Sequence, residues 1–238
     1  MNVIVLAAGE SYTDSADKGY PLCLTEFNGV PLLQKISEKL AFNSGKTVFL
    51  FQDKHIKKHH LNNIVQLLSN GNFESFPVPE NTAGAACTAL LGVVGLDQEE
   101  PLLIVSANQY LDIDYQEFTT EMESKNYDAG TVVFDSVHPR YSYVLLDDQK
   151  TVVEASEKNP ISRNATAGVY WFSKTRDFSN SVMNMIRKDA RVNEHFYICP
   201  SFNELILLGK TIGVKEIDKS FYHPLKTQTQ FDSNKGDL

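Results

Sequence analysis

The chain has 238 residues, of which 42% are hydrophobic and 22% charged, a composition typical of a globular protein that buries its own core. The formal net charge of −8 argues against the broad basic face that nucleic-acid or anionic-membrane binding requires, but it leaves room for a local basic pocket. No apolar run approaches a membrane span and the first residues do not resemble a signal peptide, so we expect a cytoplasmic protein. Its three cysteines, Cys23, Cys87 and Cys199, follow no metal-ligand spacing, and we expect reduced apolar fillers.

Strand-like and helix-like patterns alternate through the first half of the chain. Strands are predicted at 2–6, 47–51, 72–78, 102–106 and 129–134, and those at 2–6 and 102–106 are expected to be buried. Helices are predicted between them, with Pro31 at the start of the first, Asp53 as cap of the second, Thr82 as cap of the third and 115–124 as the fourth. This alternation predicts a mainly parallel sheet with helices on both faces.

The second half mixes strands and helices less regularly. Strands are predicted at 141–146, 152–155, 167–172 and 212–217, and a helical stripe runs from Phe178 to Ile186. Ser201 and Glu204 have the spacing of a capping box, which predicts another helix after Ser201. The polar tail from Lys226 is expected to fray. We therefore predict one α/β domain over 1–238, with a mixed, mainly parallel sheet flanked by helices.

The first strand leads into a run of small residues. Val3–Leu6 is followed by Ala7-Ala8-Gly9, and a later Pro-Leu segment from Pro21 ends in Gly29-Val30-Pro31 before a helix. Ligands of doubly wound sheets bind over the carboxyl ends of the strands, where small residues let backbone N–H groups approach a phosphate or a base. The layout resembles the N-terminal signature of the sugar-phosphate nucleotidylyltransferase family; the plainer alternative is an ordinary turn of another doubly wound protein.

The resemblance implies a nucleotidyltransferase-type, Rossmann-like fold with a nucleotide-binding half at 1–135 and a sugar-phosphate-binding half at 136–225. It implies a nucleoside triphosphate and a sugar phosphate or phospho-alcohol as substrates, pyrophosphate as product and Mg²⁺ as cofactor. The Gly/Ala-rich segment 80–90 would lie under the base. The implied nucleotide-binding residues are Leu6, Ala7, Ala8, Gly9, Glu80, Gly84, Ala85 and Asn108.

Three segments of the second half resemble the sugar-binding part of the family: 137–144, 154–162 and 167–172. They match an Arg-Tyr-Gly/Ser stretch, a Glu-Lys-Pro motif and a Gly-Ile-Tyr-x-Phe strand, with Asn159 as an insertion before the proline. The implied sugar-phosphate-binding residues are Ser142, Glu157, Lys158, Gly168 and Tyr170. The segment 193–206 resembles relatives that act on capsule or lipopolysaccharide precursors.

The charged residues of the signature are replaced in this sequence. The family's Arg and Lys positions are Thr13 and Leu22, its metal-binding Asp is Asn108, and the Asp of a second metal-binding element near the end is Pro224. Loss of one charged transition-state contact commonly costs ~10²–10³ in rate. Mg²⁺ binding and enzyme activity are therefore in doubt, unless Lys18, Asp14 or Asp17 takes over.

Three functions remain open at this point. The chain could transfer a nucleotidyl group in surface-glycan precursor synthesis. It could be a degenerate homologue that only binds nucleotide or sugar phosphate, or that pairs with an active homologue; in either case a homo-oligomer stays open. It could also be a glycosyltransferase that uses Asp112 and Asp114, although helix capping explains these residues more simply.

Two weaker signals favour structural explanations. His55 and His59 have a spacing that can hold a metal, but the surrounding lysines favour a solvated helix face. Trp171 is expected in the core rather than as a platform for a sugar ring.

Overall fold

The computed structural model describes residues 1–9, 20–69 and 71–225, and a nine-stranded sheet forms the centre of this part of the chain. Its parallel half has the order β6 (Leu102–Ser106), β1 (Asn2–Leu6), β4 (Thr47–Gln52), β5 (Phe73–Val78). Strands β1, β4 and β6 are almost continuously hydrophobic, as expected for parallel strands covered on both faces. Their carboxyl ends therefore lie together at one edge of the molecule.

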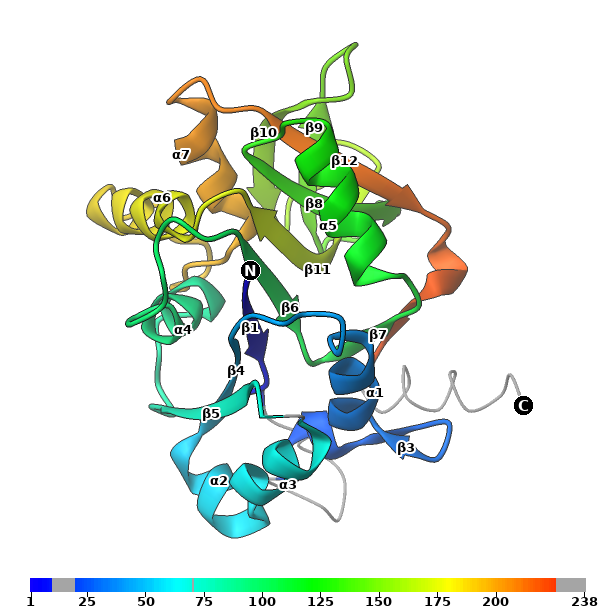
Figure 1. The fold of residues 1–238 in the computed structure, drawn as a ribbon. Coiled ribbons are helices and arrows are strands. Elements are labelled where there is room, and N and C mark those ends of the chain that lie inside the picture. The colour runs from blue at the N-terminus through cyan, green and yellow to red at the C-terminus, as the bar shows by residue number, and fades with distance from the viewer. Residues whose placement is uncertain (10–19, 70, 226–238) are drawn as a thin grey trace.

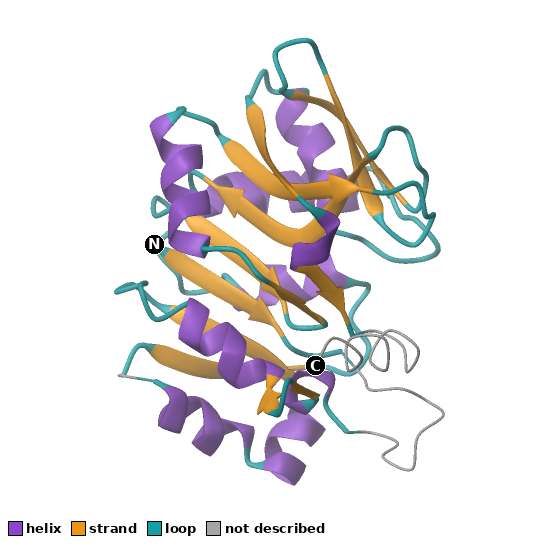
Figure 2. Ribbon diagram, turned by 90° about the vertical axis from the view of Figure 1, so that its right-hand side faces the viewer, coloured by secondary structure: helices purple, strands orange, loops and turns teal. Residues whose placement is uncertain are grey.

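Strand β11 (Asn164–Phe172) joins this parallel half to the second half of the chain. It pairs antiparallel with β8 on one side, and on the other side with β6 near its carboxyl end and with β9 near its amino end, so both halves share one twisted sheet (Figure 2). The remaining strands of this sheet are β8 (Ala129–Asp135), β9 (Ser142–Leu146), β10 (Val152–Glu157) and β12 (Ile212–Ile217). The mixed, mainly parallel sheet flanked by helices is confirmed.

Helices cover both faces of the sheet (Figure 1). One face carries α4 (Ala85–Gly92), α6 (Thr175–Arg187) and α7 (Phe202–Ile206), and the other carries α1 (Leu32–Lys39), α3 (Leu61–Leu68) and α5 (Tyr115–Ser124). Alternate residues of a strand point to opposite faces, so Val3 and Val5 belong to one core and Ile4 to the other. Of these helices, none is both long and apolar enough to span a bilayer.

The core contains the residues expected there. Trp171 is buried, and all three cysteines are free, with Cys23 and Cys199 buried. Burial raises the pKa of Cys23 to about 12, so its thiol stays protonated and unreactive near neutral pH.

The helix predicted after β4 is broken in two. His60 adopts a left-handed conformation (φ 53°) between α2 (Asp53–His59) and α3. Asp53 is the first helical residue rather than a cap, because α2 starts directly where β4 ends. His55, predicted on a solvated face, is only 1% exposed, because α2 packs against β4. The predictions of a single helix, of Asp53 as its cap and of a solvated face at His55 were therefore wrong.

Two further capping predictions were also wrong. The N-cap of α4 is Gly84 rather than Thr82, whose hydroxyl lies 2.6 Å from that of Thr88. Ser201 has helical backbone angles because a 3₁₀ turn runs straight into α7, so its side chain cannot adopt the cap geometry. Glu204 of the expected capping box instead accepts from Lys188 at 2.8 Å.

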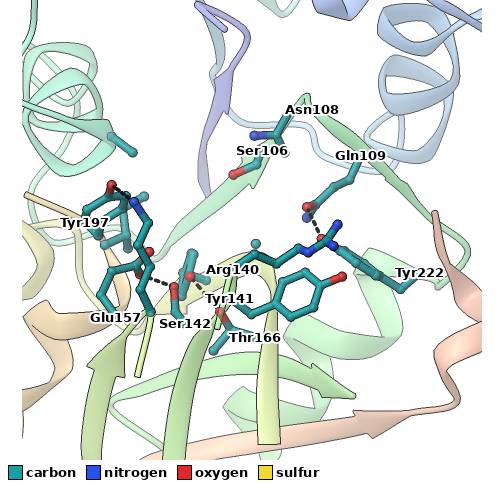
Figure 3. Close-up of a pocket in the computed structure, with 15 residues that line it drawn as sticks. Ser106, Asn108, Gln109, Arg140, Tyr141, Ser142, Glu157, Thr166, Tyr197 and Tyr222 are labelled. Atoms are coloured by element: carbon teal, nitrogen blue, oxygen red, sulfur yellow. Dashed lines mark hydrogen bonds between the residues drawn. The ribbon is translucent and has the colours of Figure 1, made fainter. Parts of the chain in front are cut away.

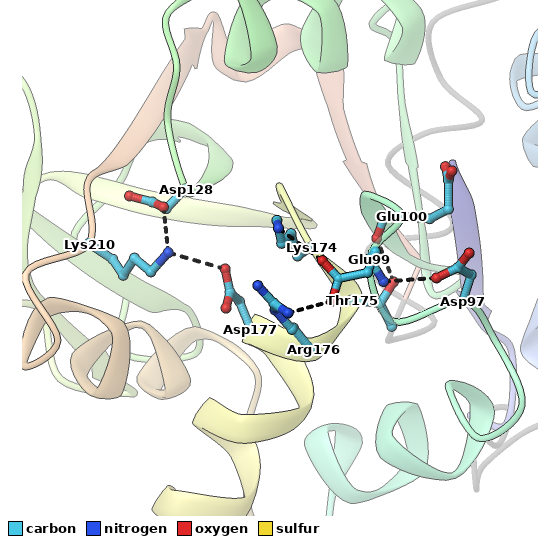
Figure 4. A network of polar contacts seen from close by, with 9 residues as sticks. All are labelled: Asp97, Glu99, Glu100, Asp128, Lys174, Thr175, Arg176, Asp177 and Lys210. Carbon is cyan, nitrogen blue, oxygen red and sulfur yellow. Dashed lines mark hydrogen bonds and ion pairs between the residues drawn. The ribbon is translucent and has the colours of Figure 1, made fainter.

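A polar network closes the sheet at the amino end of β6, opposite the carboxyl ends of the parallel strands (Figure 4). Lys210 bridges Asp128 at 2.8 Å and Asp177 at 3.5 Å, and Glu99 pairs with both Lys174 and Arg176. Burial opposes ionisation of Asp128, but bonds from Lys210 and Thr211 hold its pKa below the usual value. The charged side chains around the amino end of β6 thus pair with one another within the protein.

Candidate functional site

Two cavities open over the carboxyl ends of the parallel strands. The first, which we call the strand-end cavity, measures about 390 Å³ and lies over β1 and the start of α4. The second, the β9–β11 cavity, measures about 370 Å³ and lies beside β9, β10 and β11. Ala85, Ser106 and Asn108 line both, so the cavities are neighbours that share a wall.

The strand-end cavity collects the residues implied for nucleotide binding. Its lining includes Leu6, Ala8, Gly9, Glu80, Gly84, Ala85 and Asn108. Ala7 is outside the lining, because its side chain points into the core between those of its neighbours. The lining also contains residues that were not anticipated, among them Gln52, Thr88 and His195.

The β9–β11 cavity collects the residues implied for sugar-phosphate binding (Figure 3). All of Ser142, Glu157, Lys158, Gly168 and Tyr170 line it. Sequence reasoning missed Arg140 and Tyr141, although both lie inside a matched stretch. It also missed Tyr197, although this residue lies inside the matched segment 193–206.

Glu157 is the central carboxylate of this cavity and is only 7% exposed. The Ser142 hydroxyl donates to it, so part of its hydrogen-bonding capacity is met within the protein (Figure 3). Tyr170 lies 3.0 Å from Thr166 through their hydroxyls, and burial raises the pKa of Tyr170. The phenol is therefore neutral near pH 7 and can donate or accept a hydrogen bond.

Two cations give the β9–β11 cavity a positive rim. Lys158 has a left-handed backbone (φ 57°) and its Nζ donates to the Tyr197 hydroxyl at 2.8 Å. Arg140 stacks over Tyr141, with 5.9 Å between the guanidinium carbon and the ring centroid. Both side chains are held in place by aromatic neighbours, which favours recognition of an anion.

Gly84 allows the start of α4 to pack closely against the backbone of Phe196. Its φ is +112°, and a Cβ there would overlap the carbonyl oxygen of Phe196 and lie 2.8 Å from its nitrogen. The two segments are hydrogen-bonded from Phe196 N to Ala83 O at 2.7 Å and from Ala86 N to Phe196 O at 3.1 Å. This pairing brings His195 to the strand-end cavity and Tyr197 to the β9–β11 cavity.

Gly168 allows a close contact between β11 and the side chain of Gln109. Its φ is +69°, and a Cβ would overlap the Gln109 amide, with 3.1 Å to Cδ. Gln109 in turn donates to Ala167 and accepts from Tyr222 at 3.1 Å. The glycine thus allows β11 to pass close to the wall of the cavity.

The turn before Phe196 carries backbone strain. Asn193 and Glu194 both have positive φ (48° and 63°), and Val192 and His195 exchange two backbone hydrogen bonds around them. A two-residue turn of this kind prefers glycine at its second position. Relief of a left-handed non-glycine residue is worth roughly 1 kcal/mol.

Glu194→Gly should therefore raise the free energy of unfolding by about 1 kcal/mol. The exposed ion pair with Arg191 that this change removes contributes little. Urea denaturation measures the difference. Asn193→Gly is the matched control and should raise the free energy of unfolding by less, because asparagine tolerates this conformation well. A net loss of stability for Glu194→Gly would contradict the assignment of strain.

The replaced signature positions can be located except for Thr13, which, like Asp14, Asp17 and Lys18, lies outside the described residues. Leu22 is 4% exposed in a 3₁₀ turn, so no charge occupies that position. Pro224 belongs to β13 (Tyr222–Pro224), which pairs with β7 (Gln109–Leu111), and Leu225 N donates to Asn108 O at 3.1 Å. The two positions implied as metal ligands are thus neighbours, but they carry an amide and a proline ring.

The described residues do not fit a Mg²⁺ site. No group of three or more His, Cys, Asp or Glu side chains in the described ranges could hold a metal ion. The Asn108 Oδ1 is buried and has no hydrogen-bond partner among the described residues, but a neutral amide is a poor ligand for this hard cation.

Asp112 and Asp114 line neither cavity. Asp114 caps α5 by accepting from Gln116 N at 2.8 Å and Glu117 N at 3.1 Å, as the capping interpretation predicts. Asp112 pairs with Lys39 at 3.1 Å. Their observed contacts are structural.

A mainly parallel sheet flanked by helices, with cavities over its strand ends, is the arrangement of a ligand-binding α/β protein. Residues 17–197 match the family described as nucleotidyl transferase, and the chain belongs to this family. No curated protein matches the sequence.

Solved structures share the whole fold. A nucleoside-diphosphate-sugar pyrophosphorylase from Vibrio cholerae RC9 superposes with a TM-score of 0.82 at 20% identity, over 98% of this chain and 99% of its own. A protein from Bacillus anthracis described as a glucose-1-phosphate thymidylyltransferase, crystallised with sucrose, gives 0.79 at 15% identity over 100% and 96%. HddC from Yersinia pseudotuberculosis gives 0.67 at 15% identity over 98% and 97%. At these identities the likeness establishes the fold.

Proposed function

We propose that this chain is a sugar-phosphate nucleotidylyltransferase-type protein that binds a nucleoside triphosphate in the strand-end cavity and a sugar phosphate or phospho-alcohol in the β9–β11 cavity. In the corresponding reaction a phosphate oxygen of the acceptor attacks the α-phosphorus, and the bond to the departing pyrophosphate breaks. The observation that carries the proposal is the wall shared by the two cavities, at Ala85, Ser106 and Asn108. Because the two cavities adjoin at these residues, substrates bound in them would approach each other there. Positioning of two reactants in this way is a major source of rate acceleration.

The chemistry of the β9–β11 cavity supports an anionic sugar as the acceptor. Glu157 can accept from sugar hydroxyls, while Lys158 and Arg140 can bind a phosphate. The likeness of the segment 193–206 to relatives of capsule and lipopolysaccharide synthesis supports a surface-glycan precursor as the product.

A second candidate function is binding with little or no turnover, alone or beside an active homologue. The observation that favours it is the state of the signature positions: Leu22 is buried and apolar, Asn108 is an amide and Pro224 has no ligand atom in its side chain. The described lining of the strand-end cavity also contains no lysine or arginine to neutralise a triphosphate.

Pyrophosphate release and calorimetry separate these functions. With UTP, CTP or dTTP, glucose 1-phosphate and Mg²⁺, we expect nucleotide binding with turnover well below the usual ~1–10³ per second. Turnover inside that range would show that the residues 10–19 supply the missing charge. Absence of nucleotide binding would overturn the proposed function.

Lys158→Ala should weaken binding of a sugar phosphate by about 10-fold or more, because a hydrogen bond to a charged group is worth about 1.5–3 kcal/mol. Tyr197→Phe, which only frees the lysine from its hydroxyl partner, should have a smaller effect. Calorimetry with glucose 1-phosphate measures both. Lys150→Ala is the control, since Lys150 is exposed, pairs with Glu216 and lines neither cavity. Equal affinity for Lys158→Ala and the control would contradict the acceptor site.

A further inference from the structure

Gln52 is a buried polar residue that the signature of the family does not explain. It is the last residue of β4, is 5% exposed and lines the strand-end cavity. Its Nε2 donates to the carbonyl oxygen of Ala8 at 2.8 Å. Its Oε1 is buried and has no hydrogen-bond partner among the described residues.

An unpaired buried acceptor costs free energy unless a ligand satisfies it. The bond to Ala8 determines which way the amide faces, because a flipped amide would put two carbonyl oxygens together. Gln52 therefore offers one oriented acceptor beside Ala8 and Gly9, the small-residue turn that would accommodate a base.

We infer that Gln52 reads the nucleobase: its Oε1 accepts an N–H from the Watson–Crick edge of the bound nucleotide. One acceptor matches a base that carries its Watson–Crick N–H hydrogens on a single nitrogen, namely uracil, thymine, cytosine or adenine. Gln52 is then a specificity-determining residue, and this inference rests on the proposed function.

The test combines a substitution with ligands that lack the N–H. UTP, CTP and ATP are titrated by calorimetry, and the tightest is compared with its analogue: 3-deazauridine, zebularine or purine riboside triphosphate, respectively. The wild-type protein should bind the analogue about 10-fold more weakly, the scale of one lost hydrogen bond. Gln52→Leu should bind the parent nucleotide about 10-fold more weakly and should no longer distinguish it from the analogue.

This loss of discrimination separates a direct contact from an indirect one. If Gln52 only held the turn at Ala8, the substitution would weaken both ligands and leave their ratio unchanged. Gln34→Leu is the matched control. Gln34 lies on α1, donates a hydrogen bond of 2.9 Å to Glu38 and lines neither cavity. This variant should retain the wild-type ratio.

The outcomes also separate this inference from the proposed function. If the wild-type protein binds none of the three nucleotides and also neither dTTP nor GTP, both are overturned. If it binds a nucleotide but does not distinguish the analogue, or if Gln52→Leu keeps the wild-type ratio, only the role of Gln52 is overturned. If the variant folds poorly, the wild-type comparison alone still overturns the role of Gln52 when the nucleotide and its analogue bind equally.

Discussion

Gly84→Ala should lower the free energy of unfolding by about 3 kcal/mol or more. The new Cβ would lie 2.8 Å from the backbone nitrogen of Phe196 and would overlap its carbonyl oxygen. Phe196 cannot move away easily, because hydrogen bonds to Ala83 and Ala86 hold it on both sides. The φ of +112° adds roughly 1–2 kcal/mol for any residue with a Cβ.

Gly95→Ala is the matched control for this effect. Gly95 also has a positive φ, 84°, but nothing lies within 4 Å of its hypothetical Cβ. Gly95→Ala should therefore lower the free energy of unfolding only by the cost of the positive φ, roughly 1–2 kcal/mol. Urea denaturation of both variants measures the difference, and equal losses would show that the contact between α4 and Phe196 can relax.

Gly84→Ala should also weaken ligand binding at both cavities. The pairing of 83–86 with Phe196 positions His195 on one side and Tyr197 on the other. Displacing it disturbs the wall of the strand-end cavity and the support of Lys158 together. Gly95→Ala should leave binding at both cavities unchanged.

Hydrophobic runs and turn chemistry made much of the fold predictable from sequence. Strands β1, β4 and β6 are continuous apolar runs, which buried parallel strands require. The cap at Asp114 follows from local spacing alone. The break at His60 was not predictable in this way, because the stripe from Leu61 to Leu68 continues the spacing of a single helix.

The residues of the candidate site likewise fall into two groups: those that a local sequence motif indicated and those whose position depends on distant contacts. Gly84, Glu157 and Gly168 were found because each belongs to a local motif that resembles the family. Gln52 and Tyr197 were missed because their position depends on contacts between segments far apart in sequence: Gln52 reaches Ala8 from β4, and Tyr197 depends on the pairing of Phe196 with Ala83. A polar residue at the end of the buried strand β4 was the one available signal for Gln52.

Leu22→Lys, which would reinstate the family's lysine, should instead lower the free energy of unfolding by about 3 kcal/mol. Leu22 is only 4% exposed, and the turn that holds it is closed by a bond from Thr25 N to Leu22 O at 3.0 Å. An ammonium group placed there must lose its hydration or pull its turn open. Leu22→Met keeps the apolar volume and should cost less than about 1.5 kcal/mol.

The pH dependence identifies the cause. Burial lowers the pKa of a lysine in the folded state, so at neutral pH the unfolded chain binds more protons and stability rises with pH. The deficit of Leu22→Lys relative to Leu22→Met should therefore shrink as the pH approaches the unfolded lysine value of about 10.4. If the deficit is absent and nucleotide binds more tightly, the new lysine reaches the strand-end cavity from this turn. The loss of the signature charge would then be reversible by one substitution, whereas a pH-dependent deficit means that the turn has become part of the core.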